Sequence, residues 1–220
     1  MPAPASPLDP RVQAGMGRQL VDWRAALESG ATRVGWKIGL NPPAILERLG
    51  LDRPVVGHLT SATRCDSGAT HSLAGGRKVV VEPEVAVEVG PGGEIAALAP
   101  ALEVVDIDRP PDDVEDVVAT NVFHRAVTIG PPAQGDLNGA EATITRNGEV
   151  EHRLDPGQAA EDLAGAVETI AATLQACGER LEPGDWIITG VLAGPFEVSP
   201  GDTLALDLGP IGAVELSFAP

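Results

Sequence analysis

The sequence predicts an α+β protein built on mixed β-sheets. Segments with strand character outnumber those with helical periodicity, and the two kinds do not alternate regularly, as they would in a doubly wound fold. No internal repeat or low-complexity linker divides the 220 residues, and 43% of them are hydrophobic, so the chain can bury a substantial core. We therefore expect one main domain.

The N-terminal region should form a helix, a strand and a second helix. After a proline-rich tail of about ten residues, an apolar stripe at helical spacing predicts a helix that ends at Gly30. Its members are Met16, Leu20, Trp23 and Leu27. Residues 33–40 (RVGWKIGL) predict a short strand. Asn41, followed by proline, is a typical N-cap for a helix over 42–49, which Gly50 should close.

From residue 55 to about 150, glycine and proline signals break the chain into short predicted strands. The candidates are 79–89, 93–98, 101–107, 126–130, 141–146 and 149–153. A long helix should follow, because Asp155-Pro156 can open it, an apolar face runs along it and Gly178 ends it. The chain then returns to predicted strands at 185–189, 195–198, 203–208 and 213–218.

The strand predicted over 79–89 (VVVEPEVAVEV) has two contrasting faces. Side chains two apart on a strand share a face, so Glu82, Glu84 and Glu88 lie on one side and valines on the other. Pro83 has no N–H for a ladder hydrogen bond, which favours a sheet edge or a bulge at this end. In a chain this acidic, such a face is ordinarily solvated.

A cation site is the alternative interpretation of these carboxylates. Carboxylates held close together repel one another unless a cation or protons intervene. Glu103, in the largely apolar segment ALEVVDID, is the best third candidate, because an unpaired carboxylate on such a face would be costly. Three carboxylates with water or substrate would suit Mg²⁺ or Mn²⁺.

Lys37 is the other polar residue of interest, since it lies between Gly35 and Gly39 on the strand at 33–40. Glycines there permit close approach of a ligand, although a strand lysine is ordinarily a surface charge. The histidines show no metal-ligand spacing and are expected at surface or structural positions; they are His58, His71, His124 and His152. The chain has no nucleophile elbow, phosphate-binding glycine loop or dinucleotide fingerprint.

Composition excludes several classes of partner. With 15 basic and 32 acidic residues the net charge is −17, which argues against nucleic acid and anionic membrane surfaces but is compatible with a cation site. No apolar run is long enough to span a bilayer, and the first residues do not resemble a secretory signal. Cys65 and Cys177 do not form a disulfide or zinc pattern. We expect a cytoplasmic protein.

Six segments occur in an order that resembles a known family. They are GWKIGL, VVGHL, EPEVAVEVG, ALEVVDID, GDWIITGVLAG and VSPGDTLALDLGPIGAVELSF. The chain resembles the 2-keto-4-pentenoate hydratase / 4-oxalocrotonate decarboxylase family of the fumarylacetoacetate hydrolase superfamily, from about residue 33 to 218. The resemblance implies a mixed β-sheet roll of the fumarylacetoacetate hydrolase C-terminal type, with one long and a few short helices. We therefore expect a catalytic domain over 33–220, preceded by a tail and short helix over 1–32.

The resemblance also implies a set of functional residues and a chemistry. Its metal ligands, carried over residue by residue, are Glu82, Glu84 and Glu103, and Lys37 lies at the active site. Asn121, Thr189 and Gly190 match positions that line the same pocket. The implied cofactor is Mg²⁺ or Mn²⁺, chelated by the carboxylate and 2-oxo oxygens of a small 2-oxo acid, which is then hydrated or decarboxylated. Members of the family generally form homo-oligomers.

The chain departs from the family pattern on the substrate side. Only about 30 residues precede GWKIGL, and the family's V-A-D-N-A-S segment reads VATNVFH, which keeps Asn121 but introduces His124. Before the long helix, DPGQAAEDLAG places Glu161 and Asp162 where the family has small or neutral residues. Two alternatives follow: a metal-dependent C–C hydrolase of an acylpyruvate, with His124 or Glu88 as candidate base, or a degenerate homologue with altered or no catalysis.

Overall fold

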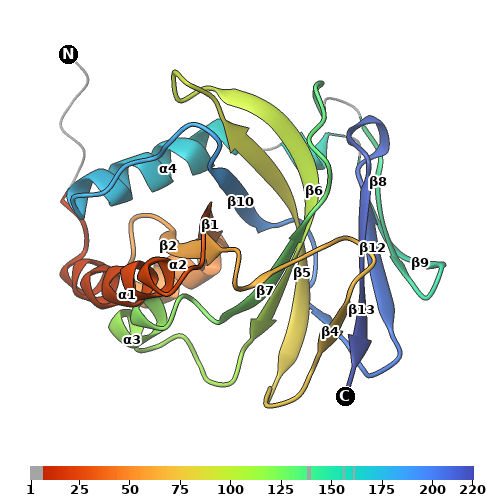
Figure 1. Ribbon diagram of the computed structural model, residues 1–220, viewed down its shortest axis with the longest axis horizontal. Helices are drawn as coiled ribbons and strands as arrows, with labels where there is room; N and C mark the ends of the chain where they lie inside the picture. Colours follow the sequence, from red (N-terminus) through yellow and green to blue (C-terminus); the bar gives the residue numbers. More distant parts are fainter. Residues whose placement is uncertain (1–6, 138–139, 156, 161) are drawn as a thin grey trace.

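The computed structural model describes residues 7–137, 140–155, 157–160 and 162–220, which fold around two mixed β-sheets. The helices lie on one side of the central strands and the smaller sheet lies on the other (Figure 1). The α-helices of the described residues are α1 Pro10–Glu28, α2 Pro43–Leu49, α3 Val114–Ala119 and α4 Leu163–Ala176. Short 3₁₀ turns occur at Gln158–Ala160 and Gly209–Ile211.

The larger sheet has eight strands and carries the candidate site. Its strands are β1 Arg33–Gly39, β2 Val55–Thr60, β3 Arg64–Cys65, β5 Val79–Val89, β6 Ile95–Asp106, β7 His124–Ile129, β10 Trp186–Val191 and β11 Phe196–Glu197. They are ordered β2-β1-β10-β5-β6-β7-β3, and β11 also pairs with β5. The β1–β10 and β3–β7 pairs are parallel and the others are antiparallel, so the sheet is mixed as predicted.

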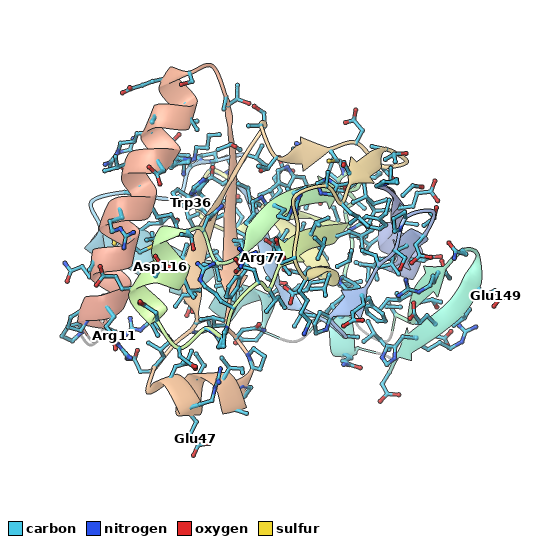
Figure 2. The ribbon with its side chains drawn as sticks, turned by 90° about the horizontal axis from the view of Figure 1, so that it is seen from below. Arg11, Trp36, Glu47, Arg77, Asp116 and Glu149 are labelled. Atoms are coloured by element: carbon cyan, nitrogen blue, oxygen red, sulfur yellow. The ribbon has the colours of Figure 1, made fainter. Side chains whose placement is uncertain are left out.

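The smaller sheet packs beside β5–β7 (Figure 1). Its strands are β4 Thr70–Ser72, β8 Ala142–Arg146, β9 Glu149–Leu154, β12 Thr203–Asp207 and β13 Ala213–Ala219, in the order β4-β13-β12-β8-β9. In Figure 2, Trp36 lies within the body of the protein and Glu149 lies at the far tip of this sheet. One buried cluster contains side chains from both sheets and from the helices, which makes a continuous hydrophobic core.

The structure corrects several element boundaries. The strands expected at 93–98 and 101–107 are one strand, because buried Pro100 continues β6 and its carbonyl accepts a hydrogen bond from Gly130. The first helix begins at Pro10, with the Asp9 side chain as its N-cap. The second helix is capped by Pro42, one residue after the expected Asn41, and Gly50 closes it at φ 64° as predicted.

Other elements were missed or begin elsewhere. The short helix α3 and the strands β2 to β4 were not among the predicted elements. The helix α3 has fewer than two turns and β3 and β4 have two and three residues, too few for periodicity to mark them, whereas β2 is as long as the predicted strands β7 and β9. The long helix begins at Leu163 and not at Asp155, after a residue in the left-handed region, Asp162 at φ 52°. Pro156 and Glu161, which entered that prediction, lie outside the described residues.

The strand β5 lies in the centre of the large sheet, between β10 and β6. The edge position suggested by Pro83 is therefore wrong. Pro83 pairs with Leu102 of β6, and on its other side its carbonyl accepts the Leu192 N–H where the chain passes from β10 to β11. The irregularity falls on β10, whose register with β5 shifts between Ile188 and Val191. Both faces of β5 are largely buried, so its carboxylates do not form a solvated face.

Within the described residues, no helix combines the length and the apolar character needed to cross a membrane.

Candidate metal centre

The three predicted carboxylates converge at the middle of the large sheet. Antiparallel pairing of β5 with β6 places Glu82 directly opposite Glu103, and Glu84 follows two residues along the same face of β5. One oxygen from each of the three carboxylates lies within 4.8 Å of the other two. Glu84 and Glu103 are fully buried, and Glu82 is mostly buried. Glu88 lies at the other end of β5, opposite Trp186, and does not join the cluster.

Glu84 is held by the backbone of β10. Its Oε2 accepts a 2.7 Å hydrogen bond from the N–H of Gly190, within the register shift that separates Ile188 from Val191. Gly190 has φ 107°, a conformation that residues with a side chain rarely adopt. The glycine therefore permits the bulge, and the bulge turns a backbone N–H toward the carboxylate.

Glu103 is held by two side chains that bond to the same oxygen. Its Oε1 accepts hydrogen bonds from Lys37 Nζ and from His124 Nδ1, the latter at 2.6 Å. Lys37 is 1% exposed and also donates to the Val122 carbonyl at 3.1 Å, so the interpretation of Lys37 as a surface charge is wrong. The other ring nitrogen of His124 lies 2.9 Å from Thr63 Oγ1. His124 is thus a buried part of the site, which spacing between histidines could not reveal.

Burial and mutual repulsion shape the protonation of the three acids. Burial, followed by the nearby charge of Glu103, raises the pKa of Glu82 to about 7. The same two effects, with Glu82 as a further negative neighbour, raise the pKa of Glu84 well above its ordinary value. Burial also opposes ionisation of Glu103, but the charge of Lys37 and the His124 hydrogen bond outweigh it and lower its pKa. The cluster therefore concentrates negative charge that a cation would relieve.

The donor set fits a hard divalent cation. Oε1 of Glu84 and Oε2 of Glu103 are buried and have no hydrogen-bond partner among the described residues. A buried carboxylate oxygen without a partner is costly in a folded protein. The cluster offers oxygen atoms alone, which is the ligand type that Mg²⁺, Mn²⁺ and Ca²⁺ prefer.

A strained turn, formed by residues 121–123, provides one of the hydrogen-bond acceptors of Lys37. Asn121, Val122 and Phe123 all have positive φ, between 52° and 63°, which is unusual for residues other than glycine. The Asn121 side chain bonds to both the N–H and the carbonyl of His58 on β2, at 2.8 and 3.0 Å. These bonds anchor the turn, which in turn directs the Val122 carbonyl toward Lys37 Nζ.

Gly35 and Gly39, on either side of Lys37, allow close packing of protein atoms, and Gly39 also lines a cavity, in keeping with the expectation that a glycine here leaves room for a ligand. A Cβ on Gly39 would lie 2.5 Å from Val122 Cγ1, and a Cβ on Gly35 would lie 1.9 Å from the Trp186 carbonyl oxygen. The missing side chains thus allow β1 to approach β10 and the strained turn.

A cavity of about 320 Å³ opens onto the cluster. Lys37 and Glu82 line it, together with a largely apolar wall from α2, the end of β6 and the strained turn. The side-chain amide of Asn121 is engaged with His58, and Asn121 is not among the described residues that line this cavity. Its neighbours Val122 and Phe123 line it instead.

Thr189 and Gly190 line an adjacent cavity of about 410 Å³. Ile38, Asn41 and Val191 contribute to both cavities, so the two lie next to each other. The Thr189 hydroxyl donates to the Val85 carbonyl at 3.0 Å, which ties β10 to β5. Asp162, at the start of α4, also lines this second cavity.

Comparison with known families accounts for this arrangement. The family model described as fumarylacetoacetate (FAA) hydrolase, C-terminal, matches residues 36–219. The chain belongs to the fumarylacetoacetate hydrolase family. The match begins at Trp36, one residue before Lys37, and includes all three carboxylates. The mixed-sheet fold expected for this family is therefore confirmed.

The relatives of this fumarylacetoacetate hydrolase family member include hydratases and decarboxylases. The chain is 29% identical to a 4-oxalocrotonate decarboxylase of Pseudomonas putida, over 87% of this chain and 79% of the relative. It is 27% identical to a 2-keto-4-pentenoate hydratase of Burkholderia vietnamiensis, over 86% of this chain and 79% of that protein. The resemblance drawn from the ordered motifs is thus confirmed.

Solved structures share the fold of this family member. A 4-oxalocrotonate decarboxylase from Pseudomonas putida G7, complexed with magnesium and adipate, superposes with a TM-score of 0.78 at 25% identity. The match covers 91% of this chain and 83% of that one. A fumarylpyruvate hydrolase from Pseudomonas aeruginosa, in complex with Mn²⁺ and pyruvate, has the same fold at a TM-score of 0.63 and 17% identity, over 86% and 90% of the two chains.

Proposed function

We propose that the protein is a divalent-metal-dependent hydratase or decarboxylase of a small 2-oxo acid or its enol. The observation that carries the proposal is the buried carboxylate cluster, with two unpartnered oxygens, beside a buried lysine at a cavity. The names of the relatives support the reaction class, because they act as hydratases and decarboxylases.

The residues divide into those that hold a metal and those that act on the substrate. Glu82, Glu84 and Glu103 would hold Mg²⁺ or Mn²⁺ through carboxylate oxygens. The metal would supply Lewis-acid stabilisation to the negative charge that develops on the 2-oxo oxygen of a chelating acid. Glu84 keeps its orientation through Gly190, and Glu103 keeps its orientation through Lys37 and His124.

Lys37 is the proposed catalytic residue. Its ammonium group is held by Glu103 and the Val122 carbonyl, and the residue lines the cavity, so one N–H can point toward a bound acid. There it can orient a substrate carboxylate or donate a proton at the carbon skeleton. General acid–base action of this kind contributes about 10²–10⁴-fold to rate.

The C–C hydrolase alternative finds less support because it needs a general base for water at the cavity. His124 is buried with both ring nitrogens engaged, by Glu103 and Thr63, and it is not among the described residues lining the cavity. Glu88 lies at the far end of β5. The alternative of a degenerate homologue is disfavoured by the intact lysine and three carboxylates. We also expect a homo-oligomer, as the family resemblance implies.

Metal-dependent thermal stabilisation tests the metal site. We expect Mg²⁺ or Mn²⁺ to raise the melting temperature of the wild-type protein, and Glu84→Gln to abolish that shift. Glu88→Gln, on the same face of the same strand, is the matched control and should keep it. An unchanged metal-induced shift in Glu84→Gln would refute the ligand assignment.

Oxalate tests the chelation model, since it mimics the head of a 2-oxo acid. It should bind only when metal is present, and metal-independent binding would contradict the model. The reaction itself is best identified by a screen of 2-oxo acids and acylpyruvates for metal-dependent loss of enol absorbance. Hydration, decarboxylation and C–C cleavage then give different products from one active substrate.

A further inference from the structure

One face of the short helix α2 forms a wall of the cavity that opens onto the carboxylate cluster. Pro42, Ile45 and Arg48 line the cavity at intervals of three residues, as one face of a helix requires. Glu47 belongs to the opposite side and points away from the protein in Figure 2. Arg48 is thereby directed to the cavity, while its side chain stays 48% exposed. It therefore lies at the rim, whereas buried Lys37 lies at the inner end.

The ionisable groups lining this cavity are few. Among the described residues, they are Lys37, Arg48 and Glu82. Lys37 is already paired with Glu103, and Glu82 belongs to the carboxylate cluster. Arg48 is thus the cation left for a second anionic group of a ligand whose head lies at the cluster. In a chain with a net charge of −17, a cation at the rim also favours the approach of an anionic substrate.

The present partner of Arg48 is weakly held. Its Nη1 lies 3.2 Å from an Asp112 carboxylate oxygen, and the Asp112 side chain is 68% exposed. Exposed ion pairs of this kind are marginal in water. A carboxylate of the ligand can therefore replace Asp112 or share the guanidinium with it, because arginine offers five N–H donors in a planar fork.

Apart from Asn41 and the three ionisable residues, the described residues that line the cavity are apolar. They include Ile45 of α2, Val105 and Ile107 at the end of β6, and Phe123 of the strained turn. Such a wall suits the hydrocarbon middle of a ligand and excludes a polar one. The cavity thus presents a polar inner end, an apolar middle and a cationic rim.

We propose that Arg48 is a specificity-determining residue that selects 2-oxo dicarboxylic acids by binding the carboxylate farthest from the carboxylate cluster. This inference rests on the proposed function, since it takes the 2-oxo acid head to lie at the cluster. It adds the class of substrate: an acid with a second carboxylate at the end of a short apolar chain.

A purely structural role for Arg48 makes a different prediction. Arg48 lies in the last turn of α2, where the helix dipole favours a positive charge. If it acted only there, its removal would weaken α2 and affect every ligand of the cavity alike. Binding of paired ligands that differ only in the distal carboxylate separates the two roles.

The test measures dissociation constants by calorimetry with saturating Mg²⁺, for two matched pairs of acids. The pairs are 2-oxoadipate with 2-oxohexanoate, and 2-oxoglutarate with 2-oxopentanoate. Wild-type protein should bind the better-fitting dicarboxylate about tenfold or more tightly than its partner, as a charge-assisted hydrogen bond predicts. Arg48→Gln should remove this preference and change the binding of the monocarboxylates less than twofold. Arg48→Lys should retain part of the preference.

Arg18→Gln is the matched control. Arg18 is a similarly exposed arginine on α1, paired with Glu115 at 3.6 Å and outside the cavity lining, so its removal should preserve the preference. An equal loss for both members of a pair in Arg48→Gln, or no loss at all, would overturn the assignment. Monocarboxylates that bind only with metal, without any preference for dicarboxylates, would overturn this inference and leave the proposed function standing. Failure of all four acids to show metal-dependent binding would reject both.

Discussion

The two sheets differ in how deeply they bury their paired charged side chains. The eight-stranded sheet encloses Lys37 and Glu103, whose side chains are 2% and 0% exposed and bonded to each other. The five-stranded sheet carries Arg146 near the surface, with Glu151 and Asp202 at 2.9 and 2.8 Å from its guanidinium. Both sheets thus contain cation–carboxylate contacts, but only the first places them where water cannot compensate a lost partner.

This difference shows which acidic residues carry functional information. Carboxylates are abundant throughout the chain, and most of those on the small sheet face solvent, as Glu149 does in Figure 2. In the large sheet, Glu84 and Glu103 each keep a buried oxygen without a partner among the described residues. Burial together with missing partners, and not acidity alone, therefore distinguishes the candidate metal centre.

The largest expected effect follows from removing the buried cation. Lys37→Met leaves Glu103 buried without its main positive partner, and loss of one member of a buried pair costs about 3–5 kcal/mol. Urea unfolding of the metal-free protein should show this loss. The double variant Lys37→Met/Glu103→Gln should recover much of it, because the orphaned charge is gone. A loss below about 1 kcal/mol in the single variant would show that the pair is not coupled.

The buried site also shows which features of the molecule the sequence alone could predict. The alternation of Glu82, Glu84 and valines on one strand predicted which side chains share a face, and the ordered motifs predicted the family. Neither could show that Lys37 is paired with Glu103, which lies 66 residues further along the chain. That contact depends on the strand order β1-β10-β5-β6, in which β10 comes from the C-terminal part of the sequence.

His124 was a candidate base for the hydrolase alternative, but its pairing with Glu103 was missed for the same reason. Its contact with Glu103 depends on the β6–β7 pairing and on the strained turn before β7, neither of which leaves a local signature. The prediction that Pro83 lies at a sheet edge was wrong because its neighbour on the β10 side, Leu192, bonds only to the Pro83 carbonyl. Proline needs no N–H for that contact, and the sequence around Pro83 does not reveal it. Local chemistry predicted the residues, and long-range pairing decided their roles.

The next largest loss of stability is expected from replacing a glycine in the large sheet, which can be compared with the same replacement in the small sheet. Gly35 has φ 149°, and a Cβ there would lie 1.9 Å from the backbone oxygen of Trp186, so Gly35→Ala must push β1 away from β10. Strain and overpacking together should cost at least about 2 kcal/mol. Gly148, in the β8–β9 turn of the small sheet, has φ 82°, but a Cβ there would meet no atom of the described residues within 4 Å.

Gly148→Ala should therefore cost only the backbone strain, about 1 kcal/mol. Equilibrium unfolding in urea gives both values from the same protein. Equal costs for the two substitutions would mean that the close approach of β1 to β10 is not maintained in solution.

His58, on strand β2 of the large sheet, should make the stability of the protein sensitive to acid. Burial, followed by the charges of His124 and Lys37, lowers the pKa of His58 on β2 to about 4 from an ordinary value of 6.5. Between pH 4 and 6.5, His58 therefore binds a proton more readily in the unfolded chain than in the folded protein. The contribution to stability is complete above pH 6.5 and is lost as the pH falls, by up to about 1.4 kcal/mol per unit.

The variant His58→Gln should remove this acid sensitivity. Between pH 7.5 and pH 5, the wild-type protein should lose up to about 2 kcal/mol more stability than the variant does. His152→Gln, at an exposed position on β9, is the control and should follow the wild-type profile. Parallel profiles for wild type and His58→Gln would show that His58 is solvated well enough to titrate normally.

The smallest effect is expected at Arg146, where Arg146→Met removes a cation from the small sheet. Its side chain is 24% exposed, and each carboxylate that it contacts has an alternative. Asp202 keeps hydrogen bonds from the Ser199 N–H and the Asn147 amide, and Glu151 can turn to water. The loss should therefore be about 0.5–1 kcal/mol, well below that of Lys37→Met although both substitutions replace a cation with methionine.

Added salt should narrow the difference in unfolding free energy between Arg146→Met and the wild-type protein, because screening acts on exposed charges. It should leave the corresponding difference for Lys37→Met nearly unchanged. A loss at Arg146 as large as that at Lys37 would mean that burial does not decide the value of these pairs, and would remove the main reason for assigning the metal centre to the large sheet.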